Sequence, residues 1–273
     1  MRWCLPVTVL ARFELSHKTT CLPSVPKRYP VPIRGPRPES GTLPFVALNS
    51  THRPLPGQHA LSRDFIAYHQ RVRIINGLAL AASEQGYQAV TVADVVKRAG
   101  IARNTFYEHF SSKEDCFLAA QQHAMSAALE EVVAAAGEVD DRPRRIEAGL
   151  AAFLAYVDRE PALARTCMVE ALAAGPRAVQ YYEESLQAFV SLFRLGRSVS
   201  PYGEELPETL EEALIGGVFW ILYQRLSATE AVCVEELLPE LVEFALTPYL
   251  GAEAARELAV TKAGAERGAG AHE

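Results

Sequence analysis

The sequence predicts an all-α protein in which a small amino-terminal helical domain precedes a larger helical domain. Apolar residues recur at helical spacing from about residue 62 to residue 260, and glycine and proline interrupt this pattern at intervals. β-Branched residues are scattered and do not alternate, so no strand is predicted. Hydrophobic residues make up 49% of the 273-residue chain and charged residues 22%, which is typical of globular domains.

Residues 1–60 differ from the rest of the chain in composition. They hold ten of the 17 prolines, and eight Lys or Arg residues against two Asp or Glu. Because proline breaks both helix and sheet, we expect a disordered or loosely attached basic extension. Two alternatives stay open: that residues 3–11 belong to a signal peptide, although Pro6 interrupts them, and that the native start lies downstream.

Charge along the remaining chain indicates which half could contact nucleic acid. Residues 61–125 hold seven basic and six acidic residues, whereas residues 126–273 hold twelve basic and 25 acidic residues. An acidic surface repels phosphate, so we expect any DNA to bind the front half. The longest near-unbroken apolar run, residues 213–223, is shorter than the roughly 20 residues that span a bilayer.

The cysteines indicate a reducing compartment. Their number is odd and their spacing matches no metal site, so we expect free thiols, no metal ion and a cytoplasmic protein. The five are Cys4, Cys21, Cys116, Cys167 and Cys233.

Breakers and caps divide the helical pattern into elements. Gly86 ends the first helix, Thr91 is a good N-cap for the second, and Gly100 separates the second from the third. Proline lies in the first turn of a helix or just after its end at several later boundaries. The expected helices are 66–84, 92–99, 102–110, 113–135, 143–158, 162–174, 177–197, 207–227, 234–250 with its main body starting near Pro239, and 252–260.

These helices form two domains between flanking segments. We expect a DNA-binding domain at residues 61–112, a second domain at residues 113–262 and a flexible tail at residues 263–273.

Residues 91–110 have the pattern of a helix-turn-helix. Val95, Val96 and Ala99 fall on one helical face, and Gly100 permits the tight turn. Phe106 and Phe110 then pack back on the first helix. The opposite face suits the major groove, and it carries Asn104, Thr105, Tyr107 and Glu108.

An ordered set of residues around this segment resembles the TetR family of transcriptional regulators. The set comprises Gly86-Tyr87, Thr91, Ala99-Gly100-Ile101, Thr105-Phe106-Tyr107-Glu108-His109-Phe110 and Lys113-Glu114. The resemblance covers roughly residues 65–260. It implies that base and phosphate contacts come from Thr91, Arg103, Asn104, Thr105, Tyr107, His109 and Lys113.

Two departures from the family pattern concern the recognition helix. Ala102 stands where many relatives have Ser, so the helix start lacks a side-chain cap. Glu108 places an anion on the presented face. It could accept from a cytosine amino group, but we favour an ion pair with a neighbouring cation. We expect the adjacent Lys97-Arg98 pair to be solvated, and the basic extension could add nonspecific DNA affinity.

The resemblance implies that the second half binds a ligand and forms a homodimer. We expect no cofactor and no enzymatic activity, because the sequence contains no catalytic motif. Candidate pocket residues are Phe153, Tyr156, Met168, Tyr181, Phe189, Phe193, Trp220 and Tyr223. Candidate dimer residues are Leu214, Val218, Ile221, Leu237, Leu241 and Phe244.

The predicted function is a ligand-responsive transcriptional regulator. The hypothesis is a repressor that binds a palindromic operator as a homodimer and is released by a small apolar ligand that shifts the helix at 113–135. The alternatives are an activator, a ligand-independent architectural DNA-binding protein, a helical enzyme and a protein-interaction module.

Overall fold

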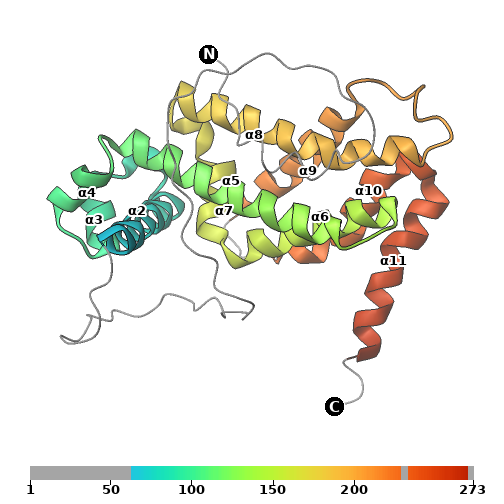
Figure 1. Cartoon of the computed structure of the whole chain (residues 1–273), viewed down its shortest axis with the longest axis horizontal. Coiled ribbons are helices and arrows are strands. Elements are labelled where there is room, and N and C mark those ends of the chain that lie inside the picture. Colours follow the sequence, from blue (N-terminus) through green and yellow to red (C-terminus); the bar gives the residue numbers. More distant parts are fainter. Residues whose placement is uncertain (1–62, 229–232, 270–273) are drawn as a thin grey trace. The chain divides into compact units, whose positions relative to one another are not determined.

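The computed structural model describes residues 63–228 and 233–269, and every regular element in these ranges is helical (Figure 1). The expected all-α class is therefore confirmed. The α-helices are α2 (Arg63–Gln85), α3 (Val92–Ala99), α4 (Arg103–His109), α5 (Lys113–Gly137), α6 (Arg142–Arg159), α7 (Pro161–Met168), α8 (Pro176–Arg194), α9 (Leu210–Ser227), α10 (Leu238–Leu250) and α11 (Ala252–Ala269). Short 3-10 helices are η1 (Tyr87–Ala89), η2 (Ala171–Ala173), η3 (Leu195–Ser198) and η4 (Val234–Leu237).

Most expected helices are present, and the differences lie at their ends. α3 has the predicted bounds, and α10 begins one residue before Pro239, as the proline indicated. The segment expected as one helix at 162–174 is two elements, α7 and η2. α8 becomes a 3-10 turn after Arg194, and α9 begins at Leu210 rather than at residue 207. α11 runs to Ala269, past the expected end at residue 260.

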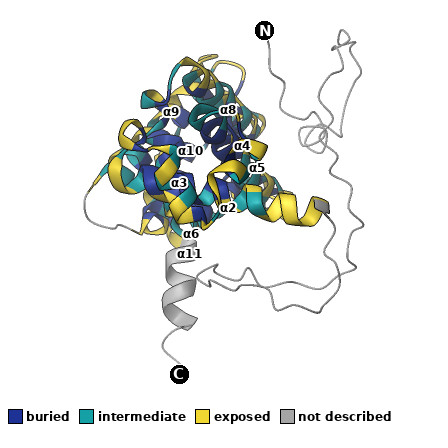
Figure 2. Cartoon of the chain, turned by 90° about the vertical axis from the view of Figure 1, so that its left-hand side faces the viewer, coloured by how far each residue is buried: buried dark blue, intermediate teal, exposed yellow. Residues whose placement is uncertain are grey.

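The long helix α5 connects the helix-turn-helix to the rest of the protein. It packs against α2 of the helix-turn-helix region and against α6, α7 and α8 of the second half. Buried side chains occur along its whole length, from Cys116 to Ala136. Figure 2 shows the buried residues where the helices face one another, and exposed residues along the first turns of α2. A movement of α5 would therefore change its contacts with both halves of the protein.

Three of the five cysteines lie in the described ranges. Cys116 and Cys167 are buried and Cys233 is exposed, and all three are free thiols. Cys4 and Cys21, like the basic extension, lie outside the described residues. No helix in the part of the chain that the structure describes is long and apolar enough to span a bilayer.

Candidate functional site

The turn between α3 and α4 is a left-handed glycine. Gly100 has φ 62° and ψ 41°, a conformation that is costly for residues with a Cβ. The amide of Ile101 donates to the carbonyl of Val96 at 3.2 Å, which closes the end of α3. The predicted tight turn is therefore present, and it sets the angle at which α4 leaves α3.

Two phenylalanines hold α4 against the body of the domain. Phe106 is fully buried, Phe110 is nearly so, and their ring centroids lie 5.8 Å apart. The Arg71 guanidinium of α2 stacks 4.4 Å from the centroid of the Phe110 ring and donates to the carbonyl of His109 at 3.2 Å. These contacts fix the inner face of α4 and leave the opposite face outward.

The outer face of α4 presents polar side chains to solvent. Arg103, Asn104, Tyr107 and Glu108 are exposed, with 47% of Tyr107 accessible, whereas Thr105 is half-buried. The Arg103 guanidinium donates to the Tyr107 hydroxyl at 3.4 Å. A cation, an amide and a phenol on one helical face form a set that can contact base edges and phosphates.

Two of our expectations for α4 meet different outcomes. Ala102 precedes the helix in an extended conformation without a side-chain cap, as its methyl side chain requires. Glu108 makes no ion pair with any described residue, so the neighbouring cation that we favoured as its partner is not found in this part of the chain. Its carboxylate is thus available to whatever lies against α4.

Thr91 caps α3 as predicted. Its hydroxyl accepts from the amide of Asp94 at 3.3 Å, and its own amide donates to the Asp94 carboxylate at 2.9 Å. The hydroxyl also donates to that carboxylate at 2.6 Å, and these bonds from Thr91 hold the pKa of Asp94 below its ordinary value. A phosphate contact from Thr91 would have to compete with Asp94 for the hydroxyl proton.

Lys113 lies at the start of α5 and holds the segment before α3. Its Nζ donates to the carbonyls of Tyr87 at 2.9 Å and Val90 at 2.8 Å, and lies 4.2 Å from the centroid of the Tyr87 ring. Partial burial lowers the pKa of the Lys113 ammonium. An ammonium has three donors, so one remains for the phosphate contact that the family resemblance implies.

His109 turns toward α2 rather than fully outward. Its Nε2 lies 3.2 Å from Oε1 of Gln70, and burial, followed by the charge of Arg71, lowers the pKa of the imidazole. Both effects favour the uncharged form of the ring. Its expected contact with a phosphate stays a prediction, and in the free chain the ring joins α4 to α2.

Sequence reasoning missed the contribution of α2 to this site. Arg73 donates to the carbonyls of Ala99 at 2.6 Å and Gly100 at 3.0 Å, and so caps the end of α3. A Cβ on Gly77 would lie 2.9 Å from the carbonyl oxygen of Val95, which means that α2 and α3 pack in backbone contact. A glycine inside an apolar helical pattern was the available signal for this close approach.

α3 is a surface helix that buries only one of its faces. Val95 is fully buried as predicted, but Val96 is only half-buried because it borders the turn. Lys97 is exposed, and Arg98 forms an ion pair with Glu84 of α2. The expected solvated pair is thus one solvated lysine and one arginine that ties α3 to α2.

A small apolar cavity lies in the second half between α5, α6, α8 and α9. Three of the predicted pocket residues line it: Phe153, Phe189 and Phe193. The rings of Phe153, Phe189 and Phe219 form a cluster with centroids 5.2–5.8 Å apart. The cavity volume is about 10 Å³, which is about the space that one water molecule needs, and its lining is apolar.

The other predicted pocket residues lie elsewhere. Tyr156 and Met168 are buried and Tyr181 is half-buried, but none of them lines this cavity. Trp220 is a correction, because 60% of it is exposed and its ring stacks on Tyr223 at 5.6 Å between centroids. Residues 213–223 of α9 are apolar all round, so the sequence pattern does not distinguish the side that faces the core from the side that faces away.

The predicted dimer residues need the same correction. Leu214, Val218 and Leu241 are buried within the protomer, and Leu237 is nearly so. Ile221 is half-buried, and Phe244 is the one exposed member of that set of six. The apolar residues that remain exposed or half-buried on α9 and α10 include Gly216, Trp220, Tyr223 and Phe244.

Comparison with known proteins identifies the helix-turn-helix. Residues 74–120 match the family of bacterial regulatory proteins described as tetR family. The chain is 31% identical over 87 residues to the HTH-type transcriptional activator FasR of Mycolicibacterium smegmatis, a match that covers 30% of this chain and 40% of FasR. The chain spans between 40% and 60% of the length of the curated relatives it matches.

The similarity to solved structures extends from the helix-turn-helix into the second half of the chain. The fatty acid degradation regulator FadR of Bacillus halodurans superposes with a TM-score of 0.60 at 18% identity, over 65% of this chain and 94% of FadR. FadR of Bacillus subtilis in complex with stearoyl-CoA superposes with a TM-score of 0.55 at 16% identity, over 66% and 98%. At this identity the likeness concerns the fold. The sequence match assigns residues 74–120 to the tetR family of bacterial regulatory proteins, and the likeness to these structures shows that the second half shares their all-helical fold.

Proposed function

We propose that this protein regulates transcription by inserting α4 into the major groove of operator DNA. The supporting observation is the outer face of α4, where Arg103, Asn104 and Tyr107 are exposed while Phe106 anchors the helix from behind. Asn pairs with adenine, Arg with guanine, and Tyr reaches phosphate. Thr91, Thr105, His109 and Lys113 border this face and supply further contacts.

We also propose that the protein binds as a homodimer through α9 and α10. Trp220 and Phe244 are large, apolar and exposed, and Gly216 has open space above its Cα. A Cβ on Gly217 would lie 2.8 Å from the Phe244 ring, so a small residue is needed where the two helices meet. Two copies would place two recognition helices about one DNA turn apart, which requires a palindromic operator.

The proposed effector is an apolar ligand with an acyl chain. The cavity lined by Phe153, Phe189 and Phe193 is apolar, and the FadR of Bacillus subtilis that shares this fold was solved with stearoyl-CoA. A cavity of about 10 Å³ admits no acyl chain, so the aromatic cluster must open. A ligand that binds only the opened form shifts the protein toward that form and away from operator binding.

The sign of regulation has two candidates. Repression relieved by the ligand is the first. Activation is the second, because the relative FasR is named as an activator. Transcription in vitro from the bound promoter separates them: the purified protein lowers transcript yield if it represses and raises it if it activates.

Selection of DNA from a random pool tests the proposed function. We expect a palindromic consensus, and an affinity that falls steeply with salt because Lys and Arg displace counterions from phosphate. Stearoyl-CoA should weaken binding to the selected fragment, whereas coenzyme A alone should not. If the protein retains no DNA at any salt concentration, DNA binding is rejected. If it binds DNA but stearoyl-CoA does not weaken this binding, only the proposed ligand class is rejected.

A further inference from the structure

The peptide groups of Tyr87 are held from two sides by different parts of the second half. Its amide donates to Oε2 of Glu170 at 2.8 Å, and its carbonyl accepts from Nζ of Lys113 at 2.9 Å. Its ring is buried and packs edge-on against Phe117 of α5, with centroids 4.7 Å apart. Gly86, at φ 78°, sets the direction of the chain as it enters Tyr87.

The two holders belong to elements that reach the apolar cavity. Lys113 begins α5, and Val132 on the same helix lines the cavity. Glu170 lies between α7 and η2, and α8 follows directly after η2 and carries the cavity residues Phe189 and Phe193. Movement of α5, or of the α7–η2 segment that leads into α8, would therefore act on the two peptide groups that flank Tyr87.

The segment that is held leads directly into the helix-turn-helix. η1 is followed by Val90, whose carbonyl Lys113 also holds, and then by Thr91, which caps α3. A second bond joins η1 to the same region, because the amide of the Gln88 side chain donates to the carbonyl of Ala173. A rotation of η1 would thus tilt α3 and, through the Gly100 turn, α4.

We propose that Tyr87 is the point where the state of the second half is passed to the recognition helix, and that Glu170 is the positioning residue on one side of it. This inference rests on the proposed DNA-binding function and specifies how that function is regulated. The bond from Tyr87 to Glu170 has a charged acceptor, which makes it shorter and stronger than a hydrogen bond between neutral groups. A displacement of η2 by about 1 Å takes the bond outside hydrogen-bond distance, so it is either made or broken.

A hydrogen-exchange experiment with a DNA fragment tests this coupling without knowledge of the effector. Coupling between sites is reciprocal, so DNA bound at α4 must change residues 171–178 by the same route. We expect DNA to alter exchange there by about fivefold or more in the wild-type protein, the lower end of common coupling strengths. The probe is the fragment selected from the random pool.

Three variants separate positioning from a merely structural role. Glu170→Ala should keep DNA affinity and protection on α4 but lose the change at residues 171–178. Glu170→Gln retains a carbonyl oxygen that can accept from the Tyr87 amide, and should restore most of the change in exchange at residues 171–178. Glu183→Ala removes an exposed carboxylate from α8 and should behave as the wild type.

The outcomes are decisive in both directions. An unchanged exchange response in Glu170→Ala, or no response at residues 171–178 in the DNA-bound wild type, would overturn the coupling. If thermal unfolding shows that Glu170→Ala does not fold, Gln88→Ala replaces it, and a full response in that variant would overturn the proposal too. A protein that retains no DNA from the pool would reject the proposed function and this inference with it.

Discussion

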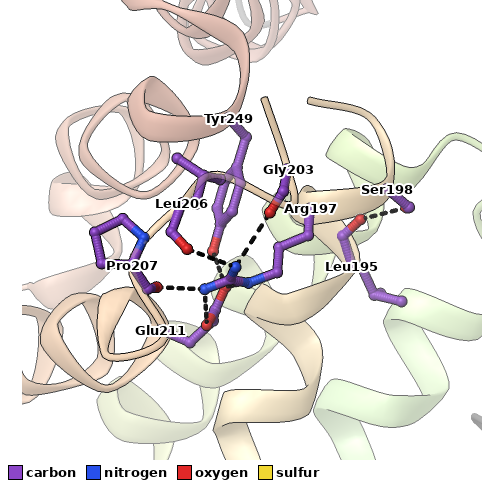
Figure 3. A network of polar contacts seen from close by, with 8 residues as sticks. All are labelled: Leu195, Arg197, Ser198, Gly203, Leu206, Pro207, Glu211 and Tyr249. Atoms are coloured by element: carbon purple, nitrogen blue, oxygen red, sulfur yellow. Dashed lines mark hydrogen bonds and ion pairs between the residues drawn. The ribbon is translucent and has the colours of Figure 1, made fainter. Parts of the chain in front are cut away.

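The partly exposed Arg197 and the buried Glu211 form an ion pair that closes the connection between α8 and α9 (Figure 3). Nε of Arg197 lies 2.7 Å from Oε1 of Glu211, and the Tyr249 hydroxyl donates to the same oxygen at 3.1 Å. The guanidinium also donates to the carbonyls of Gly203 and Leu206 at 3.1 and 3.0 Å. Arg197 thus donates to carbonyls of the loop and to the first turn of α9, and the Tyr249 hydroxyl links Glu211 to α10.

Removal of the Glu211 carboxylate should destabilise the protein. Glu211→Ala removes the acceptor of Nε of Arg197 and of the buried Tyr249 hydroxyl, which costs about 1–3 kcal/mol in the free energy of unfolding. Urea unfolding of purified protein measures this loss. Glu212→Ala, on the exposed neighbour, should change the free energy by less than about 0.5 kcal/mol. Equal stability of the two variants would mean that the pair does not hold the loop.

A methyl group on Gly77 should disturb the packing of α2 against α3. The new Cβ would meet the backbone of Val95 and Ala99 at 2.9 and 3.0 Å, so α3 must shift. We expect Gly77→Ala to lower the free energy of unfolding by about 1–3 kcal/mol and to weaken DNA binding. Gly137→Ala is the matched control, because its Cβ meets nothing within 4 Å and alanine favours the helix. A Gly77→Ala protein as stable as Gly137→Ala would contradict the packing described.

Stability should fall as the pH drops below about 6.5. Burial lowers the pKa of His123 on α5 below its ordinary value of 6.5, and His109 is lowered in the same direction. Between the lowered pKa and 6.5 the unfolded chain binds more protons, so acid favours unfolding. Urea unfolding at pH 7.5, 6.5 and 5.5 should show the decline. His123→Gln should flatten it and the exposed His69→Gln should not, and identical slopes in all three proteins would exclude His123 as a source.

Charge on the outer side of α9 should separate the subunits. Trp220→Glu places a carboxylate where we propose that two copies meet, and burial of an unpaired charge is unfavourable. Sedimentation should give a dimer for the wild type and a monomer for the variant, with unchanged helicity. Tyr202→Glu makes the same change at another exposed aromatic residue, and this control should stay dimeric. A dimeric Trp220→Glu protein would place the interface elsewhere.

The all-α class and the helix-turn-helix could be predicted from the sequence because local signals determine them. Thr91 and Gly100 mark the ends of α3 by hydrogen bonding and by backbone conformation, which depend on near neighbours in the chain. The burial of Phe106 and Phe110 follows from their helical spacing. The exposed face of α4 is then the only side left for a DNA contact.

Contacts between distant segments were not predictable from one sequence. The bonds of Arg73 to Gly100 and of Glu170 to Tyr87 join residues far apart in the chain, and polar residues give no periodic signal for such partners. Trp220 was misplaced for a different reason. Its helix is apolar on every side, and only the packing of α9 decides that Leu214 and Val218 face the core while Trp220 faces outward.

The central claim is that the outer face of α4 binds DNA. The most direct test is the affinity of an Asn104→Ala/Tyr107→Ala protein for the selected fragment, compared with the wild type and with a control. The control is Gln187→Ala/Tyr202→Ala, which also removes one side-chain amide and one phenol, at exposed positions elsewhere. We predict that the α4 variant loses about 100-fold in affinity, since each lost contact costs about 1–3 kcal/mol, while its unfolding midpoint and oligomeric state stay unchanged. An α4 variant that binds the fragment as tightly as the wild type would contradict it.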